Sequence, residues 1–190
     1  LFFVTMTEYS KLITDSGAHP AFPPEKIDTP LGAVLSVNNA RQLRITESEK
    51  ERFVTFYFNG LQEEPYTNED RIIIPSAKVP TYDQKPEMSA DEITDTIMAK
   101  LKSMKYKFIL VNFPNADMVG HTGNIEATIK AVEKVDACLG RISSFVLAQP
   151  ESALIITADH GNAEEMINLE TGQVDTEHST NSVPLIAVSR

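Results

Sequence analysis

The chain has 190 residues, 42% of them hydrophobic and 23% charged, which is enough apolar material for one globular domain with its own core. Its formal net charge of −10 argues against nucleic-acid binding, which requires a Lys/Arg-rich face, and against anionic membrane surfaces. No apolar run approaches the roughly 18 residues needed to cross a bilayer. We therefore expect neither a nucleic-acid nor a membrane partner.

Two further features bear on the setting of the chain. The single cysteine, Cys138, excludes an internal disulfide and lies in a helical apolar pattern, so we expect it in the core of a protein from a reducing compartment such as the cytoplasm. The sequence opens inside one apolar run, Leu1–Val4, and stops just after another, Val183–Val188, which predicts a buried strand. We therefore expect the chain to continue in a longer protein.

In the N-terminal part, the apolar stretch Leu1–Met6 predicts a strand, and Leu31–Asn38 predicts a short helix after a proline-rich loop. Phe53–Phe58 is rich in aromatic and β-branched residues and is followed by Asn59-Gly60, so a strand and a turn are predicted there. The next segment has scattered prolines and little periodicity, and predicts a loop with one short strand, Arg71–Ile74.

The clearest helix is predicted over Ser89–Met104. Ser89 and Glu92 have the spacing of a capping box, in which side chains satisfy the free amides of the first turn. Apolar residues recur at helical spacing along the segment. Three lysines lie at its C-terminal end: Lys100, Lys102 and Lys105. They could suggest phosphate binding, but lysines at a helix C-terminus are usually solvated and interact with the helix dipole.

The remaining segments alternate between strands and a helix. Phe108–Phe113 and Ala153–Thr157 are continuously apolar, as strands covered on both faces are, and the apolar spacing from Ile125 to Ile142 predicts a long helix between them. Strand–helix–strand order with such strands predicts an α/β protein with a mostly parallel sheet and helices on both faces.

Residue types that bind metals follow two of these strands. Asp117 and His121 come after the first, Asp159 and His160 come directly after the second, and His178 precedes the last predicted strand. Because ligands of open α/β sheets collect at the carboxyl ends of the strands, we expect these side chains to lie together. Two carboxylates and three imidazoles suffice for one metal ion and part of another.

Each of these signals is weak when it stands alone. Asp, Gly and Asn all favour turns, so Asp159-His160-Gly161-Asn162 is equally consistent with an ordinary strand-to-loop turn. A single loop histidine is more often a satisfied polar residue than a ligand. We interpret His19, which has no carboxylate beside a strand, as a surface residue.

Several ordered segments decide between these readings, because they resemble the cofactor-independent, metal-dependent phosphoglycerate mutases of the alkaline-phosphatase superfamily. The similarity runs nearly end to end. It is carried by Asn112–Gly123, Ile156–Glu164, Arg41–Lys50, Phe56–Gly60 and Val79–Asp83. The resemblance implies a three-layer α/β/α sandwich of the alkaline-phosphatase type.

The resemblance also implies the roles of individual residues. It assigns Asp117, His121 and His178 to one metal ion, and Asp159 and His160 to a second. Lys50 matches the active-site lysine that contacts the phosphoryl group. Both ions are divalent and commonly Mn²⁺, with Mg²⁺, Co²⁺ or Zn²⁺ as alternatives that the ligand chemistry alone does not separate.

The reaction implied is the interconversion of 3-phosphoglycerate and 2-phosphoglycerate through a phosphoserine, a step of glycolysis and gluconeogenesis. Residues 1–190 match the C-terminal portion of the phosphatase domain. The nucleophilic serine and the phosphotransferase domain with its substrate-binding arginines lie outside them. We therefore expect this chain alone to bind at most one divalent ion well and to be inactive; its oligomeric state is left open, with a monomer favoured.

Two other interpretations remain. A different alkaline-phosphatase-superfamily enzyme, such as a phosphopentomutase or a phosphohydrolase, would share the ligands but not the sequence around Lys50 and Asn112–Gly123. Alternatively, the chain is a non-catalytic, truncated module that keeps the metal site. Assays of phosphopentose against phosphoglycerate would separate the first alternative from the mutase.

Overall fold

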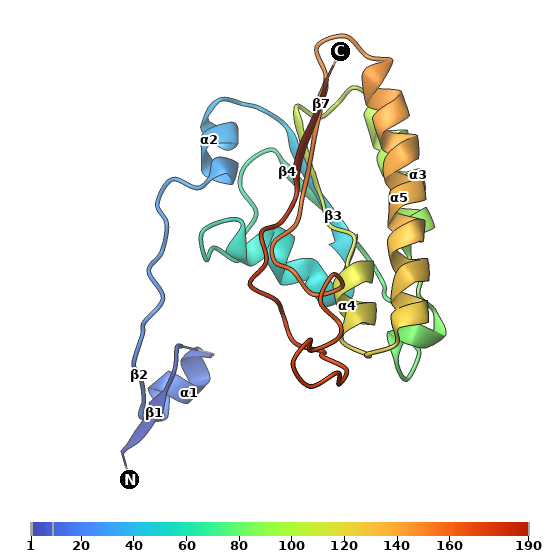
Figure 1. Ribbon diagram of the computed structural model, residues 1–190. Helices are drawn as coiled ribbons and strands as arrows, with labels where there is room; N and C mark the ends of the chain where they lie inside the picture. The colour runs from blue at the N-terminus through green and yellow to red at the C-terminus, as the bar shows by residue number, and fades with distance from the viewer. Residues whose placement is uncertain (1, 9, 190) are drawn as a thin grey trace.

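The computed structural model describes residues 2–8 and 10–189, and its centre is a parallel three-stranded sheet (Figure 1). The middle strand, β3 (Gln42–Glu47), lies between β4 (Glu69–Ile74) and β5 (Phe108–Val111). Gln42 is in register with Glu69 on one side and Phe108 on the other. The predicted α/β fold with a parallel sheet is thus confirmed, as are the strands predicted near β4 and β5.

One face of this sheet is covered by the two long helices, α3 (Ala90–Lys102) and α5 (Ile125–Leu147), which lie side by side (Figure 1). Ile93 and Ile97, one helical turn apart, meet Ile45 of the sheet in a core that Ile142 of α5 completes. These side chains are at most 5% exposed, and burial of each contributes about 1.5–3 kcal/mol. Both helices were predicted from this spacing.

The opposite face of β3 is polar. Side chains alternate along a strand, so Gln42, Arg44 and Thr46 share this face. Gln42 Nε2 donates to the carbonyl of Gly32 at 2.9 Å, which places helix α2 (Leu31–Val37) on this face. The Arg44 guanidinium lies 4.7 Å from the ring of Phe58 and 5.3 Å from that of Phe108. Burial lowers the pKa of Arg44 to about 10. Helices on both faces give the predicted three layers.

The strand predicted over Phe53–Phe58 is wrong. Residues Phe53–Tyr57 form the π-helix η2, which follows the 3-10 turn η1 (Ser48–Lys50). Local contacts outweigh the β propensity of these residues, because Phe53 and Tyr57 pack together with ring centroids 5.6 Å apart and Thr55 Oγ1 donates to the carbonyl of Glu51 at 2.7 Å. Strand propensity is a preference for packing on a pleated sheet surface, and this segment does not lie in a sheet.

The predicted capping box at the start of α3 is also wrong. Ser89 is the N-cap residue, but its hydroxyl makes no capping hydrogen bond. Its amide instead donates to Glu47 Oε1 at 2.7 Å, so a carboxylate from the end of β3 sits at the helix N-terminus. This position is favourable for a negative charge.

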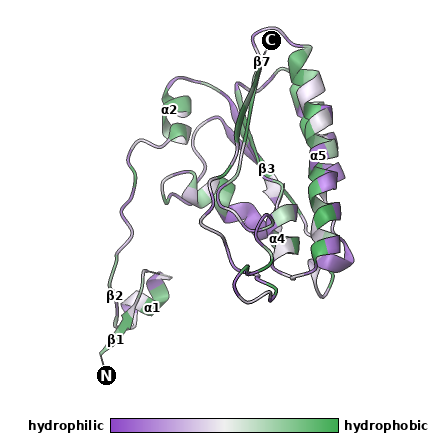
Figure 2. Ribbon diagram, viewed as in Figure 1, coloured by the Kyte–Doolittle hydropathy of each residue, from purple (hydrophilic) through white to green (hydrophobic). Residues whose placement is uncertain are grey.

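The last two strands, β6 (Ala153–Thr157) and β7 (Leu185–Ser189), form a separate antiparallel pair beside α5. Figure 2 shows the hydrophobic character of β7. Leu154 packs into the core, whereas Ile155 is 67% and Leu185 is 76% exposed. The expectations that β6 is covered on both faces and that β7 is buried are therefore wrong for the described residues.

The N-terminal residues contain more structure than the loop expected after the first strand. Strand β1 (Phe3–Thr5) pairs in parallel with β2 (Ala18–Pro20), with helix α1 (Lys11–Asp15) between them. Leu1, part of the predicted first strand, lies outside the described residues. Cys138 is 1% exposed, as predicted. None of the described helices is both long and apolar enough to cross a membrane.

Candidate metal centre

Three segments that are distant in the sequence meet where β5 and β6 end. Asp117 lies in helix α4 (Asn115–Gly120), which follows β5, and His121 is its C-cap. Asp159 and His160 follow β6, and His178 belongs to the segment that leads to β7. Because residues four apart share one face of a helix, α4 presents Asp117 and His121 together.

The Asp117 carboxylate is the centre of this cluster. Its Oδ1 lies 3.2 Å from His121 Nε2, 3.3 Å from His178 Nε2 and 4.0 Å from His160 Nδ1. Asp159 Oδ2 lies 3.4 Å from His160 Nε2. The structure thus brings all five predicted donors together.

The tautomer of His121 that this structure favours suits a metal ligand. Its Nδ1 lies 2.7 Å from the carbonyl oxygen of Thr176, which accepts only if Nδ1 carries the proton. The lone pair of His121 Nε2 then faces His178 Nε2 at 3.1 Å. Donors bound to one ion at about 2.0–2.1 Å lie roughly 3.3 Å apart, so the residues fit a cation between them.

The donors do not separate into the two predicted sets. Ligand atoms of Asp117, His160 and His178 all lie within 4.8 Å of one another, and the rings of His160 and His178 stack with centroids 3.8 Å apart. His160 is therefore near the residues assigned to the first ion as well as near Asp159. The division between two ions stays a prediction.

Lys50 approaches the cluster from the other side of Asp117. It ends η1, and its Nζ lies 2.5 Å from Asp117 Oδ2 and 4.5 Å from the ring centroid of Phe53. Burial acts to raise the pKa of Asp117, but hydrogen bonds from Lys50 and Asn162 outweigh it and hold this pKa below its usual value. Asp117 is therefore ionised at neutral pH.

Two residues that the sequence did not single out support the donors. Asn162 Nδ2 donates to Asp117 Oδ1 at 2.9 Å. Glu164 accepts from the amide of Asn162 at 2.8 Å and from the Ser179 hydroxyl, and the latter bond is the main reason that its pKa falls to about 2. With the bridge between Gly161 and Ser179, Glu164 joins the turn after β6 to the residues next to His178. Their sequence positions in a turn gave no sign of these partners.

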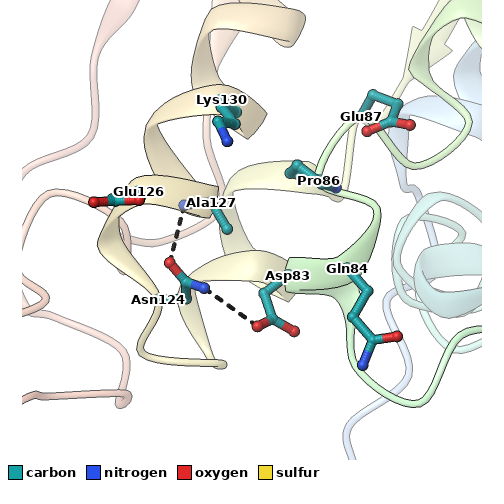
Figure 3. A pocket seen from close by; sticks show the side chains of 8 residues that line it. All are labelled: Asp83, Gln84, Pro86, Glu87, Asn124, Glu126, Ala127 and Lys130. Atoms are coloured by element: carbon teal, nitrogen blue, oxygen red, sulfur yellow. Dashed lines mark hydrogen bonds between the residues drawn. The ribbon is translucent and has the colours of Figure 1, made fainter.

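A hollow of about 350 Å³ lies beside this region, between η3 (Tyr82–Gln84) and the start of α5 (Figure 3). Asn124 accepts from the amide of Ala127 at 3.1 Å and donates to Asp83 Oδ2 at 3.2 Å across it. None of the five donors lines it; its residues are Asp83, Gln84, Pro86, Glu87, Asn124, Glu126, Ala127 and Lys130.

A comparison with protein-family models matches residues 14–190 to the Metalloenzyme superfamily. The chain belongs to the Metalloenzyme superfamily. Membership and the converging donors together support the binding of a metal ion, without fixing the identity or the number of ions.

Sequence relatives match the whole chain. A 2,3-bisphosphoglycerate-independent phosphoglycerate mutase of Clostridioides difficile (strain 630) is 53% identical over 189 residues, and that of Clostridium botulinum (strain Langeland / NCTC 10281 / Type F) is 51% identical over 189. Each match covers 100% of this chain but only 36% of the relative. The predicted resemblance to these mutases is confirmed.

Solved structures give the same fold. The phosphoglycerate mutase of Leishmania mexicana, determined at low cobalt concentration, superposes with a TM-score of 0.86 at 30% identity, over 98% of this chain and 36% of that one. The PH0037 protein of Pyrococcus horikoshii has a TM-score of 0.51 at 16% identity, over 87% of this chain and 42% of that one, and is similar in fold alone. The predicted alkaline-phosphatase-like fold is confirmed by the first match.

Proposed function

We propose that residues 1–190 are the C-terminal, metal-binding portion of the phosphatase domain of a cofactor-independent phosphoglycerate mutase, which interconverts 3-phosphoglycerate and 2-phosphoglycerate through a phosphoserine. The observation that carries this proposal is identity above 50% along the whole chain to mutases of that name. Since the chain spans 36% of their length, we place the nucleophilic serine and the phosphotransferase domain with its arginines outside these residues.

In this proposal, Asp117, His121 and His178 hold one divalent ion, and Asp159 and His160 contribute to a second. Mn²⁺ is the expected ion, and the mixed carboxylate and imidazole donors also suit Zn²⁺, Co²⁺ or Mg²⁺ to different degrees. Bound ions would supply the positive charge that activates a serine hydroxyl and neutralises the transferring phosphoryl group.

The residues of this chain then orient the metal ligands and neutralise charge on the phosphoryl group. The Thr176 carbonyl holds the His121 ring so that Nε2 points to the centre. Lys50 keeps a buried ammonium beside Asp117 Oδ2, where it can bind phosphoryl oxygens in a protein of net charge −10. Local cations are needed here, because the overall charge repels an anionic substrate.

The remaining parts of the proposal concern the whole protein. Its substrate is a small phosphorylated acid, it binds neither nucleic acid nor membranes, and it works in the cytoplasm as a monomer. Light scattering after size exclusion checks the monomer, and a dimer mass would contradict it.

The decisive experiment is an assay of the full-length protein. With Mn²⁺ and without 2,3-bisphosphoglycerate, it should convert 3-phosphoglycerate to 2-phosphoglycerate, detected by coupling to enolase, and EDTA should abolish the conversion. Isomerisation of phosphopentose or hydrolysis of nitrophenyl phosphate without mutase turnover would favour the other superfamily enzymes. Absence of all three activities with Mn²⁺ bound would favour the non-catalytic module.

The 190-residue chain provides a matched comparison. It should show no turnover and at most one tightly bound Mn²⁺ per chain, measured by titration calorimetry. Mutase turnover by this piece alone would overturn the placement of the nucleophile outside it.

A further inference from the structure

Asn162 is a buried side chain in direct contact with Asp117. It is 4% exposed, and its Nδ2 lies 2.9 Å from Asp117 Oδ1 and 3.4 Å from the Asp117 carbonyl oxygen. Both oxygens are acceptors, so only the NH₂ end of the amide can face them. The orientation of the Asn162 side chain is therefore fixed by Asp117.

The other end of the same amide has an unusual environment. Asn162 Oδ1 is buried and has no hydrogen-bond partner among the described residues. A buried unpaired acceptor typically costs about 1–3 kcal/mol, so stability alone does not favour an asparagine here. Such a group calls for a separate explanation.

Gly120 provides the space for this amide. It lies in α4, between Asp117 and His121, and a Cβ at this position would lie 2.5 Å from Asn162 Oδ1 and 3.0 Å from Asn162 Cγ. The amide lies between the Asp117 carboxylate and the Gly120 backbone, so an added methyl group would have to displace it from this position.

The backbone of Asn162 is held as well. Its amide donates to Glu164 Oε2 at 2.8 Å, and Glu164 also accepts from the hydroxyl of Ser179, the neighbour of His178. Asn162 thus connects the segment that carries Asp117 with the two segments that carry the histidines after β6 and before β7.

We propose that Asn162 is a positioning residue for the metal centre: its amide, seated against Gly120, holds the Asp117 carboxylate with Oδ1 toward the three histidines. The inference rests on the proposed function only in that Asp117 is a metal ligand. Hydrogen-bond partners of metal ligands commonly contribute about 10- to 100-fold to metal affinity.

The test is Mn²⁺ affinity, measured on the full-length protein by electron paramagnetic resonance of free Mn²⁺. Asn162→Ala should bind Mn²⁺ about 10- to 100-fold more weakly than wild type. Gly120→Ala should weaken binding similarly, because the added Cβ displaces the amide. Asn162→Ser keeps a shorter donor and should lie between wild type and Asn162→Ala.

The double variant separates positioning from general damage. If both changes act through one amide, G120A/N162A should bind Mn²⁺ no more weakly than N162A, because the added methyl group then enters the vacated space. Gly140→Ala is the matched control: Gly140 is also helical, but a Cβ there meets nothing within 4 Å, so affinity should be unchanged.

Each result decides the proposal. Affinity of N162A within twofold of wild type, or losses that multiply in the double variant, would overturn it. A wild type that binds Mn²⁺ but lacks mutase activity would contradict the proposed function without contradicting this inference. A wild type that binds no Mn²⁺ would sink both.

Discussion

Lys50 and Asp117 form an ion pair of 2.5 Å between Nζ and Oδ2, and their side chains are only 7% and 14% exposed. The second oxygen of the same carboxylate, Oδ1, lies within 4.0 Å of nitrogen atoms of His121, His160 and His178. The Asp117 carboxylate therefore contacts Lys50 with one oxygen and the three imidazoles with the other. Lys50 thus stabilises the ionised form of the Asp117 carboxylate in this largely buried position.

Replacement of Lys50 by Met should lower the free energy of unfolding of the metal-free protein by about 2 kcal/mol, because the largely buried Asp117 carboxylate loses its cation and keeps only the hydrogen bond from Asn162. Mutase turnover should fall at least about 100-fold if Lys50 binds the phosphoryl group. Urea unfolding and the enolase-coupled assay measure the two effects.

Added Mn²⁺ should reduce the stability loss in Lys50→Met, since a bound cation also neutralises Asp117. Lys130→Met is the control: Lys130 is exposed, and no ion pair within 4.0 Å is found for it among the described residues. Equal stability losses in the two variants would show that the pair with Asp117 contributes nothing.

Asp117→Asn and His178→Ala should each weaken Mn²⁺ binding at least about 100-fold, because each removes a donor near the centre of the cluster. His19→Ala should leave the affinity unchanged, since His19 is exposed on β2 and stacks on Phe2, with ring centroids 4.7 Å apart. Titration calorimetry gives the three affinities. Unchanged binding in Asp117→Asn would remove the basis for this metal centre.

Asp70 should make the folded state sensitive to acid. A hydrogen bond from Tyr106 at 2.6 Å lowers its pKa most, burial opposes this, and Arg41 and Lys105 lower the pKa further. A lowered folded-state pKa contributes stability above about pH 4, which is lost as the pH falls through that folded-state value. Relative to Asp70→Asn, wild type should therefore lose up to about 1 kcal/mol as the pH falls from 5 to 3.

Urea unfolding of both proteins at a series of pH values measures this difference. The expected loss is small because the Asp70 side chain is 34% exposed, so solvent screens its ion pairs. A difference that stays constant from pH 5 to pH 3 would contradict the prediction.

Glu47 should behave in the opposite way. It is fully buried, and burial raises its pKa above the usual value despite the hydrogen bond from Ser89. A raised folded-state pKa means that the folded protein takes up a proton first, so its contribution is largest at low pH and is lost as the pH rises. Relative to Glu47→Gln, wild type should gain stability as the pH falls from 7 to 4.

Thermal unfolding of the two proteins between pH 7 and pH 4 checks this sign, with Glu170→Gln, an exposed loop residue, as the control. If wild type instead becomes less stable relative to Glu47→Gln on acidification, the helix N-terminus rather than desolvation determines the pKa of Glu47.

Periodicity was sufficient for the elements that bury an apolar stripe. Helices α3 and α5 were predicted because the spacing of their apolar residues specifies which face meets a core, and strands β5 and β6 were predicted because they are continuous apolar runs. The five candidate donors were predicted because the rule about strand ends and the sequence resemblance point to the same residues. The contacts of Asn162 could not be found this way, since an asparagine in a turn has many equally good local partners.

The central strand β3 shows where such reasoning fails. Its sequence, Gln42–Glu47, contains four polar or charged side chains that are fully buried, so no hydropathy pattern marks it. Arg44 is accommodated by two aromatic rings, and Glu47 by a helix N-terminus, both supplied by distant segments. Only the assembled fold makes these residues compatible with a core.

The link between Glu164 and Ser179 also decides where the polypeptide between β6 and β7 tolerates a change of length. The two arms pair again at Ile167 and Val174, and beyond that point the tip is an exposed turn, with Leu169 93% exposed and Gly172 at φ 68°. An epitope tag inserted at this tip should leave His160 and His178 in place. The same few residues added below Ile167 would pull one imidazole away from the other.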